Sequence, residues 1–160
     1  MTTSLRKVVL GLGNILNCDE GLGVLALKQL DTQLTFKPPE LELLDGGVLG
    51  LNLLMIVEDC SHLLLLDAVD AGKSPGTVIE LEKEQIPLYA GVKLSQHQVT
   101  FQEVLGLANM RGKLPPYLHL VGVQPQNLEI GLGLSDAVRE ALPDMIHRAE
   151  RMLRRWNLID

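Results

Sequence analysis

The sequence predicts a three-layer α/β fold, in which helices cover a sheet whose central strands are parallel. Short apolar runs alternate along the chain with segments of helical periodicity, as expected of such folds. The runs at residues 8–10 and 63–66 contain only Val and Leu, which is typical of strands buried on both faces. Glycines or acidic residues follow both runs, and open α/β sheets bind ligands at the carboxyl ends of their strands.

The size and composition of the chain fit one domain over residues 1–160. Hydrophobic residues make up 46% and aromatic residues 3%, so the core must consist mainly of aliphatic side chains. The two cysteines, Cys18 and Cys60, form no Cys-x-x-Cys pattern, which argues against a disulfide framework or a thiolate zinc site. The net charge of -6 argues against nucleic acid or an anionic membrane as the main partner.

Nothing in the sequence indicates export or membrane insertion. Residues 1–7 lack the apolar stretch of a signal peptide. No apolar run approaches the roughly 18 residues that are needed to cross a membrane. We therefore expect a cytoplasmic protein with no membrane partner, and a monomer.

The first half of the chain contains two strand–helix units and a third strand. The stretch 7–14 begins as a strand and ends in glycines, and spacing of apolar residues predicts a helix over 21–32. After a break at two prolines, a short strand over 41–44 leads to a helix over 48–57. The most apolar run, 62–70, is expected to be the central parallel strand.

The second half predicts two more strands and two more helices. Residues 77–82 alternate with period two, which indicates a half-exposed strand at an edge of the sheet. A helix over 99–109 and a strand over 117–123 follow. Ser135 is a suitable N-cap for a final helical stretch, which Pro143 is expected to kink or split.

Acidic residues follow several of these apolar segments. Asp19 and Glu20 precede the first helix, where acids also serve as ordinary first-turn residues. Asp67 ends the central strand, the usual place for a side chain that faces a site. Asp45 ends the second strand before two glycines, where a turn or capping role is equally expected.

One combination of these residues suits a metal ion. Glu20, Asp67 and His97 each follow an apolar segment, and a parallel sheet would bring such ends to one rim. Two carboxylates and one imidazole form an open three-ligand site for a divalent transition metal. The remaining candidate side chains are interpreted as structural or solvent-facing: Cys18, His62, Asp70, His119 and His147.

A nucleotide site is not expected at the first strand. Gly11 and Gly13 resemble the start of a dinucleotide-binding fingerprint, but Leu16 occupies the place of its third glycine. The glycines are better explained by a tight turn that presents the residues after it.

Several stretches together resemble the hydrogenase maturation proteases, which trim the C-terminal tail of the large subunit of [NiFe] hydrogenases. The opening signature is Val9-Leu10-Gly11-Leu12-Gly13-Asn14-Ile15-Leu16 with Asp19-Glu20-Gly21-Leu22-Gly23-Val24. The similarity extends from Val8 to the last helix and includes residues 44–47, 66–68, 95–98, 120–125 and 133–135.

The resemblance implies a fold, a site and an activity. The implied fold is a twisted, mixed and mostly parallel five-stranded sheet between helix layers. The implied activity is that of an aspartic-type endopeptidase whose metal-contacting positions correspond to Glu20, Asp67 and His97, with Asp45 as a tentative catalytic acid. The implied enzyme carries no permanent metal but recognises nickel already bound by the precursor of a [NiFe] hydrogenase large subunit.

Two alternatives remain at this point. The peptidyl-tRNA hydrolases also have a strand ending in Gly-Leu-Gly-Asn, but there Pro-Gly follows, whereas Ile15 and Leu16 follow here. The protein could also be a non-catalytic chaperone that checks the metal of the precursor and cuts nothing. The sequence alone indicates neither which hydrogenase is served nor where the precursor is cut.

Overall fold

A five-stranded sheet forms the centre of the protein, with strand order β2-β1-β3-β5-β4. The structure is a computed structural model that describes residues 5–47, 50–87 and 100–160. Neighbouring strands are parallel except for β4, which pairs antiparallel with β5. The strands are β1 (Arg6–Leu12), β2 (Leu41–Gly47), β3 (Cys60–Ala68), β4 (Val78–Glu82) and β5 (Tyr117–Val123). The predicted central position of β3 and the predicted edge position of β4 are thus both confirmed.

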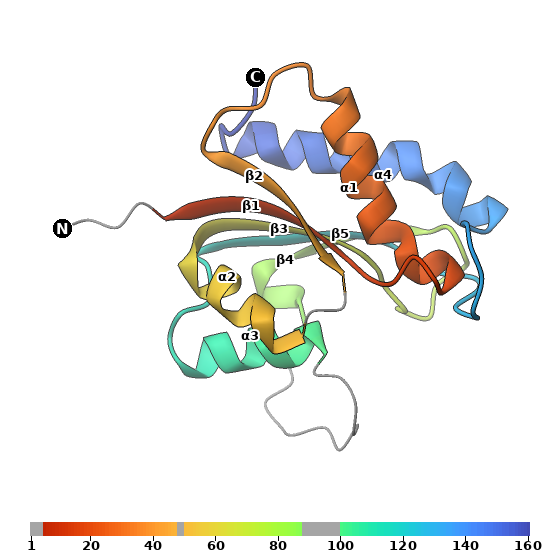
Figure 1. Ribbon diagram of the computed structural model, residues 1–160, viewed down its shortest axis with the longest axis horizontal. Helices are drawn as coiled ribbons and strands as arrows, with labels where there is room; N and C mark the ends of the chain where they lie inside the picture. The colour runs from red at the N-terminus through yellow and green to blue at the C-terminus, as the bar shows by residue number, and fades with distance from the viewer. Residues whose placement is uncertain (1–4, 48–49, 88–99) are drawn as a thin grey trace.

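Helices cover both faces of the sheet, which confirms the predicted three-layer α/β architecture (Figure 1). Helices α1 and α4 lie on one face, and α2 and α3 lie on the other. The helices are α1 (Leu22–Gln33), α2 (Leu54–Asp59), α3 (Phe101–Met110) and α4 (Asp136–Arg155). The described residues also contain three 3-10 turns: η1 (Cys18–Gly21), η2 (Gly50–Leu53) and η3 (Lys83–Gln85). None of the helices in these ranges is long and apolar enough to cross a membrane.

The side chains of the central strands alternate between two hydrophobic cores. Leu64 packs into the core beneath α1 and α4, whereas Leu63 and Leu65 pack into the core beneath α2 and α3. These leucines are fully buried, and each contributes about 1.5–3 kcal/mol of hydrophobic stabilisation. Because Asp67 is two residues beyond Leu65 in β3, its side chain faces the α2 and α3 side.

The helix predictions differ from the structure mainly at their ends. In place of one helix over 48–57, a 3-10 turn leads into α2, which continues to Asp59, and residues 48–49 lie outside the described part. Helix α3 begins after Thr100, whose hydroxyl oxygen accepts a 3.3 Å hydrogen bond from the backbone N–H of Glu103. The Glu103 side chain accepts a bond from the Thr100 N–H in return, so a capping box fixes this end.

Pro143 does not split the last helix. Helix α4 continues for 20 residues through Pro143, so the expected split is wrong. A proline in a helix interior costs about 3 kcal/mol. Burial of neighbouring apolar side chains, each worth about 1.5–3 kcal/mol, offsets that cost. These side chains are Leu142, Met145 and Ile146.

Candidate active site

A tight turn connects β1 to α1 at the carboxyl end of the sheet. Gly13 has a φ of +114°, and a Cβ atom added there would overlap the backbone carbonyl oxygen of Glu20. Any Cβ atom at Gly23 would overlap the carbonyl oxygens of Leu12 and Leu66. The start of α1 therefore lies directly against the ends of β1 and β3, which places Glu20 near the end of the central strand.

Glu20 and Asp67 are neighbours at this end of the sheet. The pKa of Asp67 is raised to about 7, mainly by burial; a hydrogen bond from the Ala68 N–H opposes this rise, and the negative charge of Glu20 adds to it. That hydrogen bond to Oδ1 of Asp67 is 2.8 Å long. As whole residues, Glu20 and Asp67 are half-buried. Two carboxyl groups in one such place can attract a cation or share a proton.

A cavity of about 440 Å³ adjoins Asp67 on the α3 side of the sheet. Its wall is largely apolar and includes Leu12, Leu65 and Leu105. Pro87 and Phe101 also line it. In sequence these two residues stand on either side of residues 88–99, which lie outside the described part of the chain. His97 lies between these two residues in sequence but outside the described residues, so the structure does not test its predicted place in the site.

Asp45 is at the same end of the sheet but on an edge strand. It is exposed and aligned with Gly11 of β1. A Cβ atom added to the next residue, Gly46, would contact the side chains of Leu10 and Leu12, which face α2 and α3. By strand alternation Asp45 faces the other side of the sheet from Asp67. Within the described ranges no three His, Cys, Asp or Glu side chains are grouped closely enough to hold a metal ion.

Asp19 has a structural role that the sequence did not reveal. It is fully buried, and its carboxylate accepts bonds from the backbone N–H groups of Gln126, Asn127 and Ser135 at 2.8, 2.9 and 2.7 Å. The Ser135 hydroxyl donates a fourth bond of 2.8 Å. Burial alone would raise the pKa of Asp19, but the hydrogen bonds from Ser135, Asn127 and Gln126 outweigh it and lower the pKa. Through these hydrogen bonds, the Asp19 carboxylate holds the segment between β5 and α4 against η1.

The other histidines within the described residues lie away from this site. The ring of His62 stacks on Tyr117 with centroids 4.4 Å apart, near the amino end of the sheet. His119 is buried on the α4 side of β5, and burial lowers its pKa against the opposing effect of Glu80. His147 is exposed on α4. These placements agree with the structural or solvent-facing interpretation.

Asp70 and Cys18 also occupy structural positions. Asp70 accepts hydrogen bonds from the Gln124 side chain at 3.1 Å and the Gly72 N–H at 3.3 Å, as expected of a turn residue. Cys18 has a φ of +48° and donates its backbone N–H to the Gly131 carbonyl oxygen at 3.0 Å. Its thiol is free and partly exposed.

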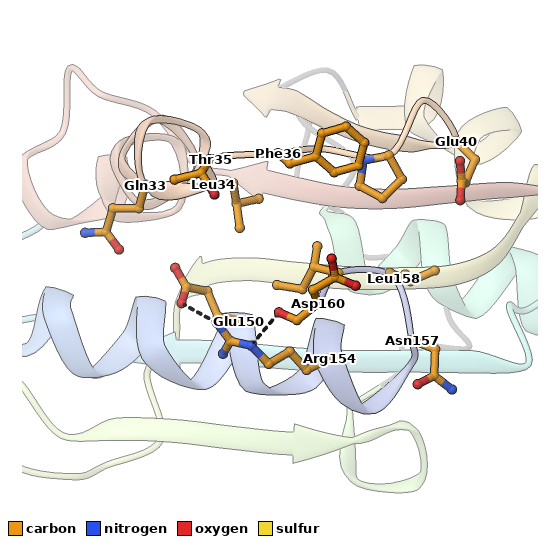
Figure 2. A pocket seen from close by; sticks show the side chains of 12 residues that line it. Gln33, Leu34, Thr35, Phe36, Glu40, Glu150, Arg154, Asn157, Leu158 and Asp160 are labelled. Atoms are coloured by element: carbon orange, nitrogen blue, oxygen red, sulfur yellow. Dashed lines mark hydrogen bonds and ion pairs between the residues drawn. The ribbon is translucent and has the colours of Figure 1, made fainter.

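A second cavity, of about 240 Å³, lies between the loop after α1 and the C-terminal residues (Figure 2). The Arg154 side chain crosses this region to the backbone oxygen of Asp160, at 3.0 Å. Gln33, at the end of α1, also lines it. Glu20 lies in η1, just before the start of the same helix, and a helix of 12 residues is about 18 Å long. This cavity therefore contains none of the predicted site residues.

The fold and site together define an α/β protein with a ligand-binding crevice at the carboxyl end of its parallel strands. The profile of the hydrogenase maturation protease family matches residues 24–152. The hydrogenase expression/formation protein HoxM of Cupriavidus necator is 41% identical over 151 residues, which cover 93% of this chain and 74% of HoxM. The hydrogenase 2 maturation protease of Escherichia coli is 36% identical over 151 residues, covering 94% of this chain and 92% of that protein.

The solved structures agree with this assignment. The hydrogenase maturating endopeptidase HybD of E. coli matches with a TM-score of 0.84 at 35% identity, covering 94% of this chain and 93% of HybD. The chain belongs to the hydrogenase maturation protease family, and it is an endopeptidase of hydrogenase maturation. The family and fold predicted from the sequence are confirmed, and the enzyme is favoured over both the chaperone and the peptidyl-tRNA hydrolase.

Proposed function

We propose that this endopeptidase removes the C-terminal tail from the precursor of a [NiFe] hydrogenase large subunit, and that it recognises nickel already bound by that precursor. Glu20, Asp67 and His97 would contact this nickel, which arrives as part of the substrate. The observation that supports the proposal is the neighbouring pair of carboxyl groups, Glu20 and Asp67, beside a cavity at the carboxyl end of the sheet.

The chemistry of this pair suits a metal-bearing substrate. Burial and a neighbouring negative charge both disfavour ionisation of Asp67, and a bound cation would relieve both effects. Carboxylate oxygens and an imidazole nitrogen are suitable ligands for nickel. The chain segment that contains His97 joins two residues, Pro87 and Phe101, that line the same cavity. His97 would therefore supply the third nickel contact beside this cavity, where the substrate binds.

Asp45 is the proposed acid–base residue. It is exposed at the same end of the sheet, level with Leu66, the residue before Asp67, and its side chain faces the other side of the sheet from Asp67. An ionised carboxylate can accept a proton from the attacking water, while the substrate's metal polarises the scissile carbonyl. Cys18 and Cys60 are both free thiols, which supports action in the reducing cytoplasm.

The test is processing of a purified nickel-loaded precursor in vitro, followed by mass spectrometry of its C-terminus. Glu20→Gln, Asp67→Asn and His97→Gln should each reduce the rate at least about 100-fold, because each removes one nickel contact. Three exposed residues of α4 allow the same chemical changes as controls: Glu140→Gln, Asp144→Asn and His147→Gln.

The outcomes separate the possibilities clearly. Normal processing by all three site variants would refute the site. Cleavage of a nickel-free precursor at the wild-type rate would refute nickel recognition. Binding of the nickel-loaded precursor without any mass change would show that the protein does not remove the tail.

A further inference from the structure

Five large aliphatic side chains are exposed on two loops at the carboxyl end of the sheet. Ile15 and Leu16 belong to the loop before η1. Leu128, Ile130 and Leu132 belong to the segment between β5 and α4, and the last two are 91% and 81% exposed. We call these five residues the rim patch. Exposed apolar side chains gathered in one place usually mark a surface that binds a partner.

The two loops of the rim patch are fastened to each other. Asn17 and Gly131 form a parallel β-bridge, and the Gly131 N–H donates to the Leu16 carbonyl oxygen at 2.9 Å. The Asn17 side chain donates to the carbonyl oxygen of Leu128 at 3.3 Å. The buried carboxylate of Asp19 holds the same segment through Gln126 and Asn127. These hydrogen bonds fix the backbone of both loops, so the apolar side chains remain exposed to solvent.

The rim patch also presents an unpaired backbone edge. Gly131 directs both its N–H and its carbonyl oxygen toward the first loop. Residues 129–130 and 132–133 form bends on either side of Gly131. The backbone groups of Ile130 and Leu132, which belong to these bends, form no hydrogen bond with any residue in the described ranges. Such an edge can pair with a further extended chain, which would also cover the exposed side chains.

The rim patch is continuous with the active site. Glu20 directly follows Asp19, and its backbone N–H donates to the Asn17 carbonyl oxygen at 3.0 Å. Asn17 itself pairs with Gly131. An extended peptide advances about 3.3 Å per residue, so residues a few positions from a bond held near Glu20 can reach the rim patch. An endopeptidase needs such a surface because its substrate continues on both sides of the scissile bond.

We propose that the rim patch binds an extended, apolar segment of the precursor that flanks the scissile bond. This segment pairs with the backbone edge at Ile130 and Leu132 and covers their side chains. The proposal rests on the proposed function for the identity of the substrate. It adds the surface that positions the substrate chain and the chemical character of the part that is bound.

The first test compares a double variant with a matched control. Ile130→Ser with Leu132→Ser removes the two most exposed side chains of the rim patch, whereas Met55→Ser with Met110→Ser removes side chains that are 75% and 72% exposed on α2 and α3. With nickel-loaded precursor, the first pair should raise both KM and the dissociation constant of the precursor about ten-fold and leave kcat unchanged. The control pair should change none of these values.

The second test examines the backbone edge by hydrogen exchange. On binding of the precursor, the amides of Ile130 and Leu132 should exchange at least about ten-fold more slowly, since they gain partners. The amide of Gly131 already has a partner and should change little.

Several results would overturn the proposal. An unchanged dissociation constant in the rim double variant, or unchanged exchange at Ile130 and Leu132, would exclude binding there. Conversion of a wild-type dimer into a monomer by the same double variant would make the rim patch an interface between two copies. Failure of the wild-type to cleave a precursor that it binds through the rim patch would instead count against the proposed function alone.

Discussion

The Asp19 carboxylate joins two segments of the chain by accepting hydrogen bonds from both the backbone N–H and the side-chain hydroxyl of Ser135, 116 positions away. Ser135 is the N-cap residue of α4, as predicted, but its hydroxyl makes no hydrogen bond to its own helix. The Asp19–Ser135 contact therefore fixes the start of α4 relative to η1. Since Glu20 is next to Asp19, this contact also fixes the position of a predicted nickel contact.

Replacing Asp19 should cost more than replacing Ser135. Asp19→Ala leaves three part-buried backbone N–H groups without their acceptor and should lower the free energy of unfolding by about 3 kcal/mol. Ser135→Ala removes one donor only and should cost about 1 kcal/mol. Urea unfolding of the three proteins measures both values. A cost below about 1 kcal/mol for Asp19→Ala would contradict the structural role.

The stability of the protein should depend on pH through Asp67. Because the pKa of Asp67 is raised to about 7 in the folded protein, its stabilising contribution is present below the ordinary carboxyl pKa and is lost as pH rises through 7. Between about pH 4 and 7 the wild-type should lose up to about 1.4 kcal/mol per pH unit relative to Asp67→Asn. Parallel stability curves for the two proteins, measured by denaturant unfolding without nickel, would contradict this prediction.

The interaction between Glu20 and Asp67 should be visible in a titration. Glu20→Gln removes a negative charge that raises the pKa of Asp67, so that pKa should fall. Carbon-detected NMR of the Asp67 side-chain carboxyl group measures the change directly. Glu84→Gln alters an exposed acid on η3 and should leave the pKa of Asp67 as it is. An equal change in both variants would exclude a direct interaction.

The turn at Gly13 should tolerate no side chain. Gly13→Ala places a Cβ atom against the backbone carbonyl of Glu20 at a φ of +114° and should destabilise the protein by at least about 3 kcal/mol. Gly72 also has a positive φ, of +69°, but a Cβ atom added there would have no neighbouring atom within 4 Å. Gly72→Ala should therefore cost only about 1 kcal/mol. Thermal unfolding separates the two; similar costs would mean that the close approach at Gly13 is unimportant.

Local sequence patterns predicted most of the fold. The run 63–66 placed β3 at the centre, and the alternation at 77–82 placed β4 at an edge. These predictions succeeded because a strand that is buried on both faces is a continuous apolar run, whereas a half-exposed strand alternates apolar and polar residues. The predictions failed where packing from elsewhere decides: Pro143 stays within α4 because burial of its neighbours outweighs a local penalty.

The sequence by itself determined the order of strands and helices, the glycine turn after β1, the family, and the acids that follow each strand, because period, turn chemistry and motif are local properties. Only the tertiary structure decided what the adjacent acids Asp19 and Glu20 do. The hydrogen-bond donors of Asp19 come from residues more than 100 positions away, whereas Glu20 lies beside Asp67 near the cavity. No local pattern contains these partners, since they meet only when β1, β3 and the segment before α4 are packed together.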